Sequence, residues 1–199
     1  MNGLLPWIKG HSGKPTHPPL TDASIGAYTA GVAMLVLGAL GVEEEQMAHG
    51  SLLAISVGLL VAPPTAVTGL LDWLDLPKGT SVRRVATIHL LLMMTTTLLF
   101  ALTWLAQLDG YKDDEIKAAA LVVGLAAFAF LAVGGNIGGA NVFVYGVRVL
   151  KRTDVPPREA LNPLGVKSEH APPREAGPPA SPASGIPPAA GRAGQPPGR

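Results

Sequence analysis

Four long stretches without Asp, Glu, Lys or Arg divide the sequence, at residues 23–42, 51–71, 85–108 and 118–147. Each reaches the roughly 20 residues that an α-helix needs to cross the hydrocarbon core of a bilayer. Helices that are apolar on every side would not stay soluble in a chain of 199 residues. The pattern therefore predicts an all-α membrane protein, with four transmembrane helices in an up-down bundle.

The rest of the sequence predicts three regions: an N-terminal cytoplasmic segment at residues 1–20, a transmembrane domain at 21–150 and a tail at 151–199. The tail holds 12 of the 19 prolines and few large apolar residues. Such a composition buries too little surface to offset the entropy of ordering. We therefore expect a disordered, Pro/Gly-rich cytoplasmic tail.

Composition excludes several classes of function. The chain has no cysteine, which excludes disulfides, thiolate metal sites, iron–sulfur ligation and covalently attached c-type haem within it. Its net charge of +1, without a concentrated basic face, argues against nucleic acid as a partner. The expected partners are the lipid bilayer and either another membrane protein or further copies of the chain.

The distribution of basic residues predicts the orientation. Eight Lys and Arg residues lie near helix ends on one side, against two on the other, Lys112 and Lys117. By the positive-inside rule both termini are then cytoplasmic, and we expect a multi-pass protein of the bacterial inner membrane. The eight residues are Lys9, Lys14, Lys78, Arg83, Arg84, Arg148, Lys151 and Arg152.

Two of the four helices contain irregular sequence. Pro63 and Pro64 fall within the second, where lost backbone hydrogen bonds predict a bend rather than an end. The fourth stretch is about 30 residues and contains the run GGNIGG at 134–139, where we expect the regular helix to fray. Small residues four apart, such as Gly134 and Gly138, permit close contact between helices.

The predicted topology places most of the unusual polar residues at one edge of the membrane. A titratable residue within a membrane segment is a candidate for function. This edge cluster comprises His17, Asp22, Asp72, Asp75, Arg83, Arg84, His89, Asn136 and Asn141.

The edge cluster has several interpretations. His17, Asp22, Asp72 and His89 offer ligands that suit zinc, manganese or iron, although at no recognised spacing. His17 and His89 also lie on the same side, so they are candidates to bind haem or a quinone. A third interpretation is structural, in which Asp72 and Asp75 pair with Arg83 and Arg84. A proton path is a weaker interpretation, because the interiors of the first, second and fourth helices carry no acid or base. Transport by four such apolar helices would need oligomerisation.

These same residues carry a resemblance to a family. Residues 13–18 read G-K-P-T-H-P, residues 69–73 read G-L-L-D-W and include Trp73, and Arg83, Arg84 and His89 open the third helix. Gly138 and Gly139 then precede Gly146 and Val147. In this order the elements resemble a family of small four-helix bacterial membrane proteins known as domain of unknown function 2231, over roughly residues 10–150.

The resemblance implies little about activity. Some relatives look like membrane modules joined to Rieske iron–sulfur domains, which implies an electron-transfer setting, yet a chain without cysteine cannot hold that cluster itself. Lys14, Met93 and Ala140 replace polar residues that the family often has. The sequence therefore predicts a non-enzymatic module that binds or anchors a partner, with a redox-associated subunit as the alternative and a transporter as the third.

Overall fold

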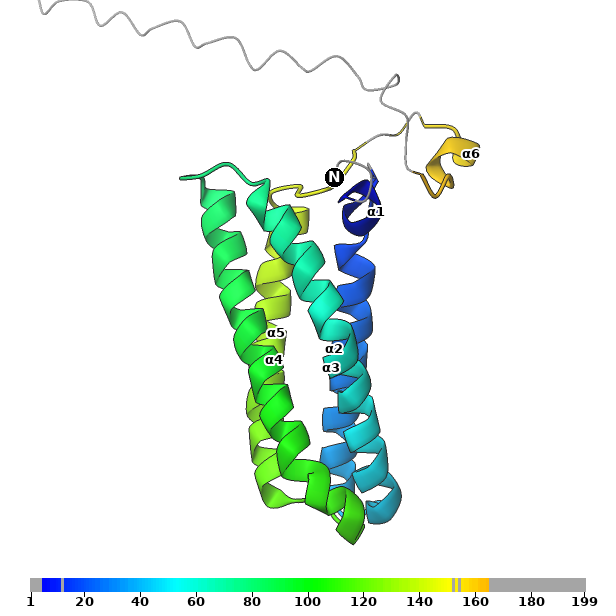
Figure 1. The fold of residues 1–199 in the computed structure, drawn as a ribbon, viewed down its shortest axis with the longest axis vertical. Coiled ribbons are helices and arrows are strands. Elements are labelled where there is room, and N and C mark those ends of the chain that lie inside the picture. The colour runs from blue at the N-terminus through cyan, green and yellow to red at the C-terminus, as the bar shows by residue number, and fades with distance from the viewer. Residues whose placement is uncertain (1–4, 12, 152, 154, 165–199) are drawn as a thin grey trace, which may run out of the picture. The chain divides into compact units, whose positions relative to one another are not determined.

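The computed structural model describes residues 5–11, 13–151, 153 and 155–164, and it is dominated by four long helices (Figure 1). These are α2 (His17–Ala39), α3 (Glu44–Leu74), α4 (Ser81–Asp113) and α5 (Ala118–Phe143). All four are long and apolar enough to span a membrane, so the predicted all-α membrane fold is confirmed. The predicted tail at 151–199 lies largely outside the described residues.

Short elements precede and follow these helices. Helix α1 (Leu5–Lys9) leads into a β-hairpin whose two strands, β1 (Gly10–His11) and β2 (Lys14–Pro15), have two residues each. After the bundle, α6 (Pro157–Ala160) is a single turn. Because the long helices alternate in direction, α2 and α4 begin at the same end of the bundle as α3 and α5 finish. We call this the terminal end, and the end with the α2–α3 and α4–α5 connections the turn end.

The helix boundaries follow local sequence. Helix α2 begins at His17, earlier than predicted, because Pro18 and Pro19 occupy first-turn positions that need no N–H partner. It stops where Gly41 takes a positive φ of 81°. Helix α4 begins after Thr80, whose side chain accepts a hydrogen bond from the Arg83 backbone N–H.

Neither irregular sequence ends its helix. Helix α3 continues through Pro63 and Pro64, as predicted. The predicted fraying of the GGNIGG run is wrong, because α5 continues through it to Phe143. The glycines in this run give α4 room to approach: a Cβ at Gly134 would lie 2.8 Å from Sδ of Met93.

The bundle consists of two helical hairpins, α2–α3 and α4–α5, and their buried positions correspond. Each residue buried in α4 lies 72 positions after a residue buried in α2. Five residues buried in α5 lie 69 positions after residues buried in α3. The pairs are Ser24/Thr96, Tyr28/Phe100, Gly31/Thr103, Leu35/Gln107 and Gly38/Gly110, then Ser51/Ala120, Ile55/Gly124, Gly58/Ala127, Ala62/Leu131 and Asp72/Asn141.

The two hairpins meet at one of these corresponding pairs. The rings of Tyr28 and Phe100 stack with centroids 3.9 Å apart and planes 2° from parallel. Both side chains are almost wholly buried, at 1% and 0% exposure. Contact between equivalent residues places a pseudo-twofold axis between them, and it runs along the bundle because α2 and α4 are parallel.

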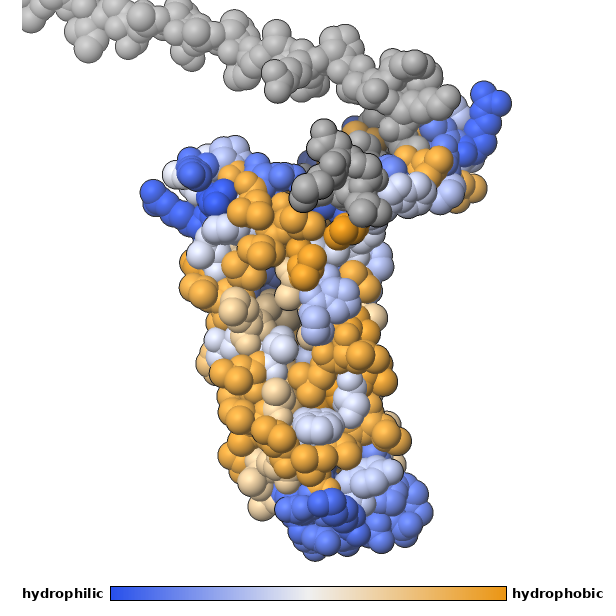
Figure 2. Space-filling model, viewed as in Figure 1, coloured by the Kyte–Doolittle hydropathy of each residue, from blue (hydrophilic) through white to orange (hydrophobic). Residues whose placement is uncertain are grey.

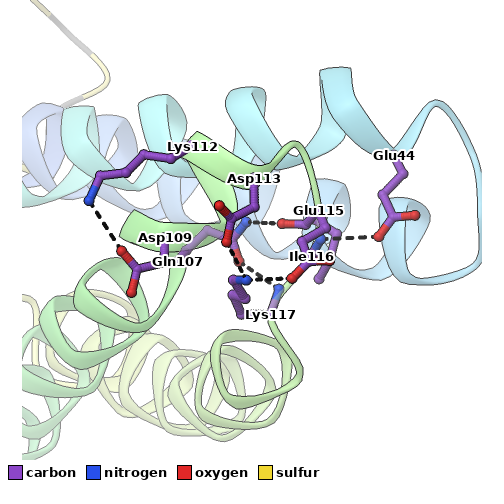
Figure 3. A network of polar contacts seen from close by, with 8 residues as sticks. All are labelled: Glu44, Gln107, Asp109, Lys112, Asp113, Glu115, Ile116 and Lys117. Carbon is purple, nitrogen blue, oxygen red and sulfur yellow. Dashed lines mark hydrogen bonds and ion pairs between the residues drawn. The ribbon is translucent and has the colours of Figure 1, made fainter.

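At the turn end a buried amide closes the α4–α5 connection (Figure 3). Gln107 Nε2 donates to the carbonyl of Glu115 at 2.9 Å, and its Oε1 accepts from the backbone N–H of Lys117 at 3.1 Å. Glu44 Oε1 accepts from the backbone N–H of Ile116 at 3.2 Å, which ties the other hairpin to the same turn.

A surface ion cluster lies beside this amide. The ammonium group of Lys117 contacts the carboxylates of Asp113, at 2.7 Å, and Glu115. Hydrogen bonds to Asp113 and then Glu115 raise the pKa of Lys117 above its ordinary value. Lys117 therefore stays charged throughout the physiological pH range.

Replacing the buried amide tests this connection. Gln107→Ala leaves a backbone carbonyl and N–H without partners, so the free energy of unfolding should fall by about 1–3 kcal/mol. Denaturation of the purified protein in mixed micelles measures it. Lys112→Ala, which removes an exposed 3.2 Å pair with Asp109, is the matched control and should change little. Equal effects of the two substitutions would contradict the role given to Gln107.

Candidate functional site

The terminal half of the bundle contains a cavity of about 530 Å³, with walls from all four long helices. Figure 2 shows the apolar band of the molecule, with a recess in this half. Most of the lining side chains are small or apolar, among them Leu59, Ala62, Ala66, Met93, Leu98 and Ala101. The polar lining residues include His17, Asp72, His89, Asn141 and Arg148. This volume lies within the range of small-molecule sites.

Two tryptophans hold α3 and α4 together on either side of this cavity. Trp73 Nε1 donates to the Thr87 hydroxyl at 2.9 Å at the terminal end. Trp104 Nε1 donates to the Ser56 hydroxyl at 2.8 Å, beyond the lining residues on the turn side. The cavity lies between these two bonds, where α3 contributes small residues such as Ala62, Ala66 and Gly69.

His17 is held by the helix that follows its own. Its Nδ1 lies 3.0 Å from the carbonyl oxygen of Thr65 in α3. A carbonyl oxygen only accepts, so Nδ1 carries the proton of the neutral ring and Nε2 keeps a lone pair. The ring lies against Gly69, where a Cβ would come within 2.6 Å of Cε1. Glycine at this position is what allows the ring to sit here.

His89 repeats this arrangement in the second hairpin. Its Nδ1 lies 2.8 Å from the carbonyl oxygen of Gly134 in α5, and a Cβ at Gly138 would come within 2.7 Å of its Cε1. In both hairpins the glycine follows the accepting carbonyl by four residues. The two histidines thus have the same tautomer, the same anchor and the same neighbour.

An acid and an amide extend the correspondence. Asp72 and Asn141 lie three residues after the two glycines, each is 8% exposed, and both line the cavity. The Oδ1 atom of each has no hydrogen-bond partner in the described part of the chain. Asp72 Oδ1 does lie 3.4 Å from Nε of Arg148, an ion pair without hydrogen-bond geometry.

Arg148 connects this site to the start of the chain. Its Nη2 donates to the carbonyls of Lys9, at 2.6 Å, and Gly10, at 3.0 Å. The residue has a positive φ of 61°, which turns the backbone after α5 back over the end of the bundle. One guanidinium therefore joins the N-terminal hairpin, α3 and the segment after α5.

The predicted pairing of the acids with Arg83 and Arg84 is wrong. Arg83 stacks on the Trp73 ring at 4.0 Å and donates to the carbonyls of Trp73 and Leu76. The Trp73 carbonyl lies in the last turn of α3 and the Leu76 carbonyl just beyond it, where the negative end of the helix attracts this cation. Asp75 pairs instead with Lys9, and Asp72 with Arg148. Arg84 is exposed.

The four-ligand metal site predicted from His17, Asp22, Asp72 and His89 is not assembled. Asp22 is exposed and does not line the cavity. Five residues along a helix turn a side chain about 140° away from His17, so the two cannot share a face. The described residues contain no group of three or more His, Asp or Glu able to hold a metal ion. His17, Asp72 and His89 do line one cavity.

The remaining predicted residues divide between the cavity and its surroundings. Trp73 and Gly138 line the cavity, whereas Gly139 does not. Neither Tyr28 nor the carbonyls of Thr65 and Gly134 are among the site residues predicted from the sequence. Tyr28 lines the cavity, and its hydroxyl, near Thr97, makes no hydrogen bond among the described residues. The repeat at 72 and 69 positions is the sequence signal that could have led to these positions, but it was recognised only from the buried residues of the structure.

The fold and the cavity define a four-helix membrane protein whose bundle encloses a largely apolar cavity with a few polar side chains in its wall. The family model described as "Predicted membrane protein (DUF2231)" matches residues 13–151, and the chain belongs to this family. The matched region covers α2–α5 and every cavity residue named above. No curated protein and no solved structure matches the chain significantly.

The two acids at this end should differ in their effect on stability. Asp72→Ala removes a buried carboxylate and leaves Arg148 without its ion pair, which should cost about 3 kcal/mol. The side chain of Asp75 is 63% exposed, so Asp75→Ala should cost less than about 1 kcal/mol. Denaturation in mixed micelles compares the two variants. Equal, small effects would show that Asp72 is solvated like Asp75.

Proposed function

We propose that the chain is a non-enzymatic membrane module that binds a lipid-soluble ligand with a polar group in the cavity between its hairpins. The observation that carries this proposal is the pairing of a largely apolar hollow with a few polar atoms that lack partners. A ligand's apolar part would contact the small side chains, and its polar groups would meet the two histidines, Asp72 and Asn141. Such a combination is typical of small-molecule sites.

The physical environment favours an occupied cavity. An empty hollow loses the packing contacts of its lining, which destabilises the bundle. An unpartnered Oδ1 atom within a membrane protein also costs free energy. A bound ligand removes both costs at once.

Binding accounts for the bundle better than transport does. The stacked rings of Tyr28 and Phe100 lie on the pseudo-twofold axis and close the cavity on its turn-end side. Beyond them, Leu35, Thr103 and Gln107 are fully buried, so the turn half is packed. The cavity is therefore a pocket at one end rather than a path across the membrane.

The orientation and the partner are part of this proposal. The terminal end carries the basic residues Lys9, Lys14, Arg83 and Arg84, which supports placing it in the cytoplasm of a bacterial cell, with the bundle in the inner membrane. As a small ligand-binding module, the protein would act beside a second membrane protein or a second copy of the chain. A redox-associated role is the second candidate, and the two histidines on one cavity favour it.

Filling the cavity tests the proposal. Ala62 lines the cavity in α3, so Ala62→Phe should place a ring where the ligand binds. Native mass spectrometry of the full chain, purified in mild detergent, should show a bound small molecule in the unmodified protein and not in this variant.

The control is the same substitution on the lipid-facing surface. Ala129 in α5 is exposed and does not line the cavity, so Ala129→Phe should keep the ligand. An unmodified protein that carries no bound molecule, or an Ala62→Phe protein that retains it in full, would contradict the proposal.

A further inference from the structure

The pseudo-twofold axis passes through the cavity as well as through the aromatic stack. Tyr28 and Phe100 lie 11 positions after His17 and His89, respectively, in two parallel helices. The stack therefore lies about 16 Å along the axis from both histidines. The histidines have equivalent positions, at one depth and on opposite sides of the axis, and both line the cavity.

Each histidine presents a lone pair rather than a proton. The Nδ1 proton is committed to a backbone carbonyl in both cases. His89 Nε2 makes no hydrogen bond among the described residues. His17 Nε2 has a 3.5 Å contact with the hydroxyl of Thr21, which already donates to the His17 carbonyl at 2.9 Å. Both Nε2 atoms are therefore available as electron-pair donors.

Two imidazole lone pairs, one on each side of the pseudo-twofold axis, favour some ligands over others. A bare metal ion needs further protein ligands, and the described residues supply no group of three. A quinone presents carbonyl oxygens, which accept hydrogen bonds and find no N–H on either Nε2. Haem iron takes two axial nitrogen ligands and receives its other four from the porphyrin, so it matches what the two rings offer.

The surroundings of the histidines fit the same ligand. Histidines that bind metals almost always donate the other ring N–H to a carbonyl or carboxylate, which fixes ring orientation. Thr65 and Gly134 provide these carbonyls. The mostly apolar walls suit a porphyrin face. The amide of Asn141 and the guanidinium of Arg148, which is already paired with Asp72, are the groups that would meet its propionates. The chain has no cysteine, so attachment would be noncovalent.

We infer that the cavity is a b-type haem site, with Nε2 of His17 and Nε2 of His89 as the two axial ligands. This inference rests on the proposed function, since it names the ligand of the same cavity. The two histidines would hold the iron between α2 and α4, while the backbone carbonyls of Thr65 and Gly134 fix the orientation of the two imidazole rings.

Absorbance spectroscopy of the full chain tests this inference. The protein is produced in cells supplied with a haem precursor, purified in mild detergent and, if colourless, titrated with hemin. We expect one haem per chain and the sharp reduced α-band of six-coordinate, low-spin iron. His17→Ala and His89→Ala should each abolish that band, whereas His49→Ala, at the turn end, should leave it unchanged. His89→Met, which keeps a ligand of similar size, should retain haem with a shifted band.

Each outcome separates the inference from the proposed function. Protein that takes up no stoichiometric haem, or a low-spin spectrum that survives in both alanine variants, overturns the haem assignment. If a quinone or another lipid is then found in the unmodified protein and lost in Ala62→Phe, ligand binding by the cavity stands without haem. Circular dichroism and gel filtration of each variant show that loss of the band is not loss of fold.

Discussion

The arrangement of this bundle depends on a hydrogen bond from a histidine ring to a backbone carbonyl of the neighbouring helix. In the bilayer a ring N–H has no water to bind, so it must find a partner inside the protein. His17 finds Thr65 and His89 finds Gly134, at 3.0 and 2.8 Å. Either ring reaches its carbonyl only because a glycine lies one turn further along. The contact fixes the helix spacing, the ring orientation and the tautomer together.

The same contact occurs twice because the two helical hairpins have corresponding residues at corresponding positions. Where they differ, the differences are coupled. Asp72 lies beside Arg148, which comes from the other hairpin's end. Its counterpart Asn141 is neutral, and the position equivalent to Arg148 is Gly79, which carries no charge. The acid is thus present in the hairpin that has a cation for it, as the cost of burying an unpaired charge requires.

The sequence predicted the elements better than their contacts. The four spans follow from length and absence of charge, and the continuation of α3 through two prolines follows from the apolar residues on both sides. The predicted fraying of α5 is wrong. Several glycines close together suggest an irregular backbone, but here Gly134 and Gly138 remain helical and leave room for Met93 and His89 to pack against α5. The predicted acid–arginine pairs are wrong because backbone carbonyls in the last turn of α3 and just beyond it bind Arg83.

The internal repeat escaped the sequence analysis for a physical reason. Corresponding buried positions share size and depth rather than identity, as Ser24 and Thr96 or Gly31 and Thr103 show. A bilayer accepts many apolar residues at each position, so the repeat is retained mainly where geometry demands it, at His17/His89, Gly69/Gly138 and Gly38/Gly110. Only the structure showed that these pairs surround one axis.

Both histidines line the cavity, donate the Nδ1 proton to a backbone carbonyl and keep a lone pair on Nε2. Nitrogen-15 magnetic resonance of histidine-labelled protein in lipid measures this directly, since protonated and unprotonated ring nitrogens resonate far apart. Without ligand at neutral pH, His17 and His89 should each show a protonated Nδ1 and an unprotonated Nε2, assigned by loss of signals in single variants. A protonated Nε2 on either ring would show that the ring does not donate through Nδ1 alone and has no lone pair to offer a ligand.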